Sequence, residues 1–203
     1  MRLLEKIVGA SDRVGRLLHT SIRCWRFAAW GRRSRIEHSA KLIAPNLVAV
    51  GSNVHICEHA WLNAHDDRQD GLPTLHIGDG SYIGRFVHIN AWQRVTIEKN
   101  VLIADRVFIS DCEHVYADPT VPIAHQGDVF KGAVTLREGC WIGINAVILP
   151  GVTVGRNAVV AANSVVHGDV ADHTVVAGAP ARFIKTTFRS KPHNEIGKKG
   201  NEK

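Results

Sequence analysis

The chain has 203 residues, of which 45% are hydrophobic and 22% charged, a composition typical of one globular domain with a sizeable core. Its net charge of +6 comes from its two ends, since residues 1–35 hold nine Lys or Arg against two acidic residues and residues 182–203 hold seven against two. The body between them is net acidic, which disfavours nucleic-acid binding. No apolar run approaches the roughly 18 residues of a transmembrane helix and no export signal is evident, so we expect a cytoplasmic protein.

The first predicted element is a basic amphipathic helix or cap within residues 1–35. Its apolar residues recur three or four positions apart: Leu4, Ile7, Val8, Val14, Leu18, Ile22 and Trp25. Such a helix can lie in a membrane interface, where acidic lipids attract the arginines opposite the apolar stripe. It can equally cap the open end of the next element. Residues 1–30 are therefore either a peripheral inner-membrane contact or a cap.

From residue 36 to residue 186, aliphatic residues recur with a period of six. The pattern is clearest at Ile142, Ile148, Val154, Val160 and Val166. Earlier runs keep the same step, with Ile36 and Ile43 at a looser spacing of seven: Val50, Ile56, Leu62, Ile77, Ile83, Ile89, Ile97, Ile103, Ile109 and Leu136. A helix needs a period near 3.6 and a strand a period of 2, so a period of six fits neither alone. It predicts an all-β solenoid in which three sixes make one triangular coil with stacked inward aliphatics.

Two polar segments interrupt the repeat. Residues 64–74 form the shorter one, and residues 111–133 form the longer one, which is rich in polar and turn residues. Loops of this length inside a compact repeat are usually functional or disordered, so we expect the longer one to protrude and carry chemistry. Residues 187–203 form a basic C-terminal tail that we expect to be flexible.

These residues carry a family resemblance. The phrase from Ile142 to Val170, preceded by Cys140-Trp141 and followed by the segment 176–182 (VAGAPAR), resembles the hexapeptide-repeat acyltransferases, particularly the galactoside, maltose and cell-surface polysaccharide O-acetyltransferases. The Asp-x-x-His motif that ends at His114 is similar to the lipopolysaccharide branch. The resemblance covers residues 36–186 and implies a left-handed parallel β-helix, assembled as a homotrimer with active sites between neighbouring prisms. Handedness follows from the resemblance alone, because a left-handed crossover breaks the usual right-handed rule.

The resemblance also implies the site residues and the acyl donor. The stretch from Ile89 to His114 resembles the galactoside and maltose branch, whose loop histidine is the general base, a role that falls on His114. Asn90 corresponds to the asparagine that hydrogen-bonds the acceptor hydroxyl, although a corner residue with left-handed backbone angles is its alternative interpretation. Acetyl-CoA is the implied donor, with no metal, and four positions correspond to its contacts: Trp141 beside the pantetheine arm, the backbone N–H of Ile144 at the thioester oxygen, Ala162, and Arg182 near the phosphates.

The proposed chemistry needs these residue types. A sugar hydroxyl becomes a good nucleophile when a base takes its proton, and imidazole, with a pKa of about 6.5, is suited to that at neutral pH. A fixed backbone N–H can stabilise the oxyanion that forms on the thioester. Glu113, Asp111 or a backbone carbonyl are the candidates for orienting His114, and His125 is the second candidate base. Cys112 and Gly168 replace a histidine and a lysine found in related branches, which leaves the coenzyme contacts less defined.

The predicted function is O-acetylation of a sugar or glycan hydroxyl in lipopolysaccharide, capsule or exopolysaccharide biosynthesis. The alternatives are N-acetylation of a nucleotide-linked amino sugar, a catalytically silent scaffold, and a zinc protein like the γ-type carbonic anhydrases. The zinc alternative draws on five histidines that lack that family's local spacing: His55, His59, His65, His76 and His88. The cysteines lie far apart without a Cys-x-x-Cys pair, which predicts reduced, packed thiols: Cys24, Cys57, Cys112 and Cys140.

Overall fold

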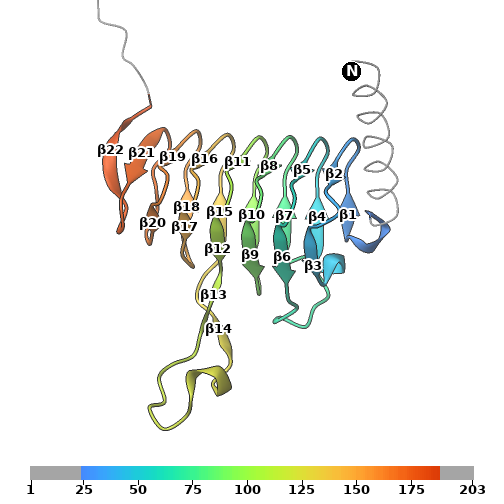
Figure 1. Ribbon diagram of the computed structural model, residues 1–203, viewed down its shortest axis with the longest axis vertical. Helices are drawn as coiled ribbons and strands as arrows, with labels where there is room; N and C mark the ends of the chain where they lie inside the picture. Colours follow the sequence, from blue (N-terminus) through green and yellow to red (C-terminus); the bar gives the residue numbers. More distant parts are fainter. Residues whose placement is uncertain (1–23, 188–203) are drawn as a thin grey trace, which may run out of the picture.

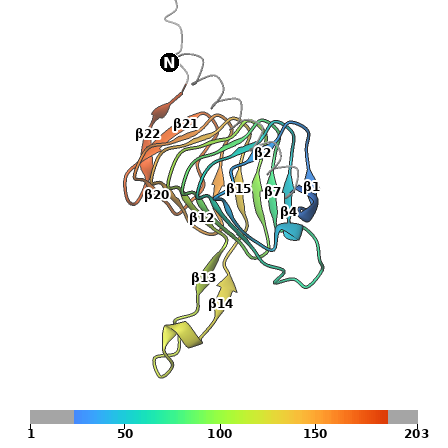
Figure 2. The ribbon, with the colours of Figure 1, turned by 45° about the vertical axis from the view of Figure 1, so that its right-hand side comes forward.

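The computed structural model describes residues 24–187, which form a prism of three parallel sheets wound around one axis (Figures 1 and 2). Each coil of the chain adds one short strand to each sheet, so the inner strands pair in parallel with strands from the coils before and after them. The last strand (Arg182–Thr186) pairs antiparallel with the strand that precedes it. The predicted all-β parallel solenoid is confirmed. We name the three faces of the prism sheets A, B and C.

The strands are two to five residues long because each coil must turn three corners. Sheet A contains β1 (Ala29–Trp30), β4 (Val48–Val50), β7 (Leu75–Ile77), β10 (Val95–Ile97), β15 (Val134–Leu136) and β18 (Thr153–Val154). Sheet B contains β2 (Arg35–Ile36), β5 (His55–Ile56), β8 (Tyr82–Ile83), β11 (Leu102–Ile103), β16 (Trp141–Ile142), β19 (Val159–Val160), β21 (Thr174–Ala177) and β22 (Arg182–Thr186). Sheet C contains β3 (Lys41–Ile43), β6 (Trp61–Ala64), β9 (His88–Ala91), β12 (Phe108–Ser110), β17 (Val147–Ile148) and β20 (Val165–Val166).

The core is a set of aliphatic columns inside the prism. In sheet B one column runs in register through buried residues of successive coils: Ile36, Ile56, Ile83, Ile103, Ile142 and Val160. The period-six prediction is wrong at Ile43, whose side chain is 37% exposed. Its neighbour Leu42 pairs with Leu62 and packs against the core instead, because alternation along β3 allows only one of two adjacent residues to face inward.

The corners of the prism are tight enough to select residue types. At the corner between sheets B and C, a Cβ on Gly143 would lie 2.6 Å from the backbone nitrogen of Ala162 in the next coil. Asn145 and Asn163 adopt left-handed backbone angles there, with φ of 59° and 58°, and the Asn145 side-chain amide donates to Asn163 Oδ1 at 2.9 Å. Asparagine tolerates this backbone conformation, so the stacked corner is stabilised by its own side chains.

The two predicted interruptions lie at the end of sheet C strands. Residues 65–74 connect β6 to β7. Residues 111–133 leave β12 and project from the prism as an antiparallel hairpin of β13 (Cys112–His114) and β14 (Asp128–Phe130), with the 3-10 turn η3 (Ile123–His125) near its tip (Figures 1 and 2). The other 3-10 turns are η1 (Cys24–Arg26) and η2 (Pro45–Leu47).

The predicted N-terminal helix lies mostly outside the described residues. Within the range 1–35, residues 24–35 contain η1 and strand β1, which already pairs in parallel with β4. The predicted C-terminal tail lies outside the described residues apart from Thr187. Among residues 24–187, no helix is long and apolar enough to cross a membrane. Cys57, Cys112 and Cys140 are buried thiols without disulfide bonds, as the sequence predicts.

Candidate active site

A pocket of about 450 Å³ opens on the outer face of sheet C, where the β13–β14 hairpin leaves the prism. Its floor comes from β6, β9 and β12, whose outward residues form two rows across the sheet. One row is aromatic, with Trp61, His88 and Phe108, and the other is polar, with Asn63, Asn90 and Ser110. The hairpin supplies the rim: Cys112, Glu113, His114 and Asp128.

The imidazole of His114 is paired with the carboxylate of Asp128. The two residues face each other across the hairpin, and His114 Nδ1 lies 2.5 Å from Asp128 Oδ1. When Nδ1 donates its proton to this carboxylate, Nε2 of the neutral ring is left as a proton acceptor. The His114 side chain is 77% exposed, so a substrate can reach it. This is the arrangement that a general base requires.

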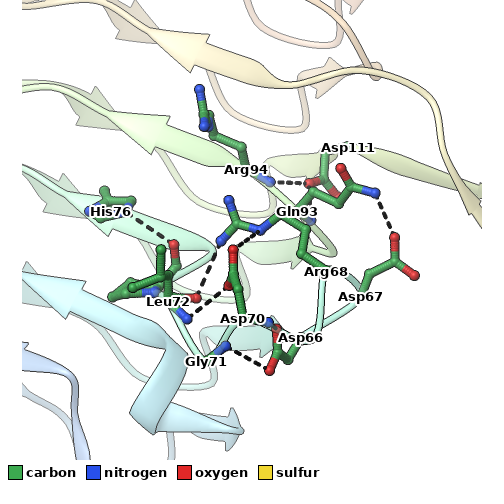
Figure 3. A network of polar contacts seen from close by, with 11 residues as sticks. Asp66, Asp67, Arg68, Asp70, Gly71, Leu72, His76, Gln93, Arg94 and Asp111 are labelled. Carbon is green, nitrogen blue, oxygen red and sulfur yellow. Dashed lines mark hydrogen bonds and ion pairs between the residues drawn. The ribbon is translucent and has the colours of Figure 1, made fainter.

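The two carboxylates expected to orient His114, those of Asp111 and Glu113, contact other groups. Asp111 is fully buried and accepts hydrogen bonds from the backbone N–H groups of Trp92, Gln93 and Arg94 at 2.8 to 2.9 Å. Figure 3 shows Asp111 beside Gln93 and Arg94. Glu113 lies 3.9 Å from the Lys131 ammonium. Sequence reasoning therefore missed Asp128, because the register of the hairpin that brings it opposite His114 could not be read from a loop without a repeat.

Asn90 lines the pocket from an extended strand, so it is not a corner residue with left-handed angles. Its Oδ1 accepts a hydrogen bond from Asn63 Nδ2 at 2.9 Å, and Asn63 Oδ1 lies 3.1 Å from His65 Nε2. This chain of contacts fixes the two amides in the floor. The amide groups that remain uncommitted are suited to a neutral, hydroxyl-bearing molecule.

The aromatic row is stacked along the sheet. Trp61 and His88 lie ring on ring at 4.2 Å, and His88 meets the Phe108 ring edge-on at 5.4 Å. Burial lowers the pKa of His88, against the opposing effect of a side-chain hydrogen bond with Asn90, so its neutral form is favoured. Trp61 Nε1 and His88 Nε2 are buried without a hydrogen-bond partner among the described residues. Both nitrogens are covered by protein atoms, so the groups that the floor offers to a ligand belong to the polar row.

Two other side chains at the site are poor catalysts. Burial raises the pKa of the Cys112 thiol to about 11, so it is protonated at neutral pH and is a weak nucleophile. His125, the second candidate base, lies in η3 near the hairpin tip and does not line the pocket. Of the two loop histidines, His114 is the one at the pocket.

The predicted coenzyme residues form a separate group. Trp141 lies on β16 in sheet B, and Ile144 and Ala162 occupy the corner between sheets B and C in successive coils, where Asn163 N–H donates to the Ile144 carbonyl at 2.9 Å. Trp141 is 47% and Ile144 38% exposed, so both can meet a ligand. Arg182 lies on β22, and its guanidinium is 3.0 Å from His167 Nε2. None of these residues lines the His114 pocket of the same chain.

The histidines considered for zinc have other neighbours. His55 lies 3.3 Å from a Glu37 carboxylate oxygen, His59 stacks on Phe86, and His65 packs on Trp92. Within residues 24–187, no group of three or more His, Cys, Asp or Glu side chains is placed to hold a metal ion.

A family model described as bacterial transferase hexapeptide (six repeats) matches residues 133–168. The chain is 33% identical over 156 residues to the galactoside O-acetyltransferase of Escherichia coli (strain K12), covering 75% of this chain and 70% of that protein. It is 35% identical over 122 residues to WbbJ of the same organism, named for lipopolysaccharide biosynthesis O-acetyl transfer, covering 57% and 62%.

A third relative is a protein of Mycobacterium tuberculosis (strain ATCC 25618 / H37Rv) that is named a probable acetyltransferase, 35% identical over 136 residues that cover 67% of this chain and 43% of that protein. The chain therefore spans less than two thirds of the length of the mycobacterial protein and of WbbJ. Among solved structures, AntD, an N-acyltransferase from Bacillus cereus in complex with dTDP and 3-hydroxybutyryl-CoA, superimposes with a TM-score of 0.70 at 22% identity, covering 83% of this chain and 88% of that one.

The fold and the site together define the class of protein. A three-sided β-solenoid with a period-six core and a pocket at a projecting hairpin is typical of hexapeptide-repeat acyltransferases. The chain belongs to the hexapeptide-repeat acyltransferase family, whose fold is the left-handed parallel β-helix.

Proposed function

We propose that the protein is an acetyl-CoA-dependent O-acetyltransferase that modifies a sugar hydroxyl in lipopolysaccharide, capsule or exopolysaccharide biosynthesis. The observation that carries the proposal is the His114–Asp128 pair at the rim of a pocket whose floor combines an aromatic row with a row of neutral polar side chains. An exposed imidazole with one nitrogen held by a carboxylate can accept a proton at the other. The similarity to galactoside O-acetyltransferase and WbbJ supports a sugar acceptor.

In this mechanism His114 Nε2 takes the proton of the acceptor hydroxyl as that oxygen attacks the thioester carbonyl. Asn90 holds the hydroxyl, and Asp128 stabilises the imidazolium that forms. The new C–O bond gives a tetrahedral oxyanion, for which the backbone N–H of Ile144 is the proposed donor. Collapse breaks the C–S bond, and the imidazolium returns its proton to the departing thiolate, so no acyl-enzyme is needed.

The separation of the two residue groups supports a shared site. Trp141, Ile144, Ala162 and Arg182 lie away from the His114 pocket of their own chain. In the proposed homotrimer, the acyl donor lies against these residues on one prism and meets His114 from the neighbouring prism. The same arrangement explains why the base stands on a hairpin that projects from its own prism (Figure 2).

An amine acceptor is the second candidate. Glu113 and Asp128 place two carboxylates at the pocket rim, and these would attract the ammonium group of an amino sugar. A panel of sugars and nucleotide-linked amino sugars, assayed by thiol release from acetyl-CoA, separates O- from N-acetylation. Mass spectrometry of surface glycan from cells that lack the protein then identifies the acceptor.

Replacement of the base tests the proposal directly. His114→Ala is expected to lower turnover by about 100-fold or more, because loss of a general base typically costs 10²- to 10⁴-fold, while coenzyme A binding stays nearly unchanged. The matched control is His125→Ala in the same hairpin, which should retain turnover. Unchanged turnover in His114→Ala would remove the assignment of this residue as the base.

A further inference from the structure

A second pocket, of about 560 Å³, lies on the outer face of sheet A beside the loop 65–74. Six residues line it, three of them basic and none acidic: Arg68, Leu72, Pro73, His76, Arg94 and Thr96. Figure 3 shows the polar network around it, in which Arg68, His76 and Arg94 come from three separate segments of the chain. Neither the predicted base nor the predicted coenzyme residues contribute to this pocket.

The backbone places the polar side chains side by side. His76 on β7 and Thr96 on β10 are partners in adjacent parallel strands, so both side chains stand on the outer face of sheet A. His76 Nε2 lies 3.1 Å from the Pro73 carbonyl, which accepts its proton, so Nδ1 of the neutral ring is a proton acceptor. Arg94 directly precedes β10 and enters the pocket from the same side as Thr96.

The two arginines of the pocket, Arg68 and Arg94, differ in the contacts that hold them. Arg68 is held by the loop, with its Nε 3.3 Å from an Asp70 carboxylate oxygen and its Nη2 3.4 Å from the Leu72 carbonyl (Figure 3). The backbone N–H of Arg94 is anchored on the buried carboxylate of Asp111 at 2.8 Å. Within the described part of the chain, the Arg94 guanidinium makes no ion pair or hydrogen bond, so its N–H donors are available to a ligand.

We propose that this pocket binds a phosphoryl group, as a phosphate monoester or diphosphate, that is attached to the acceptor. Arginine presents paired N–H donors that match phosphate oxygens, and the Thr96 hydroxyl adds a neutral donor beside them. An uncharged ligand would form no ion pair with the Arg94 guanidinium, whereas a phosphoryl group would. A carboxylate could take the same donors, but a diphosphate spans more of a cavity of this size.

The pocket adjoins the candidate active site through one short bend. Trp92 lines the His114 pocket and Arg94 lines this one, and both backbone N–H groups are held by Asp111. Two residues of chain span at most about 7 Å, which is comparable to one sugar ring and its phosphoester link. The first pocket opens on sheet C and the second on sheet A, so an acceptor that occupies both must cross this corner of the prism. This assignment to the acceptor rests on the proposed function, whereas binding of the anion does not.

The experiment measures anion binding by the full chain without any acyl donor. Inorganic pyrophosphate is titrated by calorimetry at low ionic strength and should bind saturably. Arg94→Gln should weaken this binding by about 10-fold or more, since a hydrogen bond to a charged group contributes about one to two decades of affinity. The matched control is Arg156→Gln, an exposed arginine in another coil, which should bind as the unaltered protein does.

Absence of saturable binding would overturn the proposal, as would equal weakening by Arg94→Gln and Arg156→Gln, which indicates diffuse charge attraction. Two competitors then separate the sources of the phosphoryl group. Displacement by uridine diphosphate supports a nucleotide-linked acceptor, and displacement by phosphatidylcholine vesicles carrying a polyprenyl diphosphate, but not by vesicles without it, supports a lipid-linked one. Displacement by neither contradicts the acceptor assignment. Because no turnover is measured, these results stand apart from the His114→Ala test.

Discussion

Asp128 is the residue whose role the structure defines most sharply, since its carboxylate meets Nδ1 of His114 across the hairpin. Asp128→Asn is expected to lower kcat by about 10-fold or more, because an amide nitrogen turned toward Nδ1 stabilises the tautomer that protonates Nε2. In buried triads the corresponding loss reaches about 10⁴, and the exposure of His114 makes it smaller here. Steady-state kinetics with acetyl-CoA should show the fall in kcat with little change in the KM for the donor.

The matched variant is Glu113→Gln, which removes the other rim carboxylate, one that lies near Lys131 rather than His114. It should keep most of its turnover. If Glu113→Gln lost as much activity as Asp128→Asn, the orienting role would belong to the general negative charge of the rim and not to the hydrogen bond with Nδ1.

At the scale of elements, the β13–β14 hairpin depends on how its root is fixed to the prism. The buried Asp111 accepts three backbone N–H bonds from residues 92–94, and its own carbonyl accepts the Lys131 N–H at 2.9 Å. Asp111→Asn replaces one acceptor oxygen by a donor that faces these N–H groups. It should lower the free energy of unfolding by about 1–3 kcal/mol, measured by urea denaturation, because buried donors lose their partner.

The comparison variant is Asp118→Asn, in the exposed part of the same hairpin, where the carboxylate accepts hydrogen bonds from Thr120. Its effect on stability should stay within about 0.5 kcal/mol, as is usual at surface positions. Equal effects of the two substitutions would mean that the hairpin root is not anchored by Asp111.

The secondary-structure elements also differ in how well they could be predicted from the sequence. A period of six predicted the strands and their inward residues, because each coil repeats the same steric problem, and it erred at Ile43, where the first coil departs from the period. It predicted where the hairpin begins but not its register, which depends on tertiary contacts such as those of Asp111. For this reason Asn90 and His114 were predicted and are brought together, whereas Asp128 and the Arg94 pocket were not foreseen.

For the whole molecule, stability resides in the aliphatic columns, because each coil contacts only its neighbours and the columns run through all of them. Ile103 is fully buried in the middle of the sheet B column, between Ile83 and Ile142. Ile103→Ala removes side-chain volume that surrounding coils cannot collapse to fill, so it should lower the free energy of unfolding by about 2–5 kcal/mol.

The adjacent residue offers the matched comparison, since Leu102 lies on the same strand and points outward with 44% exposure. Leu102→Ala removes a side chain of similar size from the opposite face of β11 and should cost about 1 kcal/mol, less than Ile103→Ala, because nearly half of the Leu102 surface stays in water and no closed cavity forms. Urea denaturation of both variants, at one protein concentration, measures the difference. Since one residue of slip moves every side chain to the other face, similar losses for the two would show that this column is not the core of the prism.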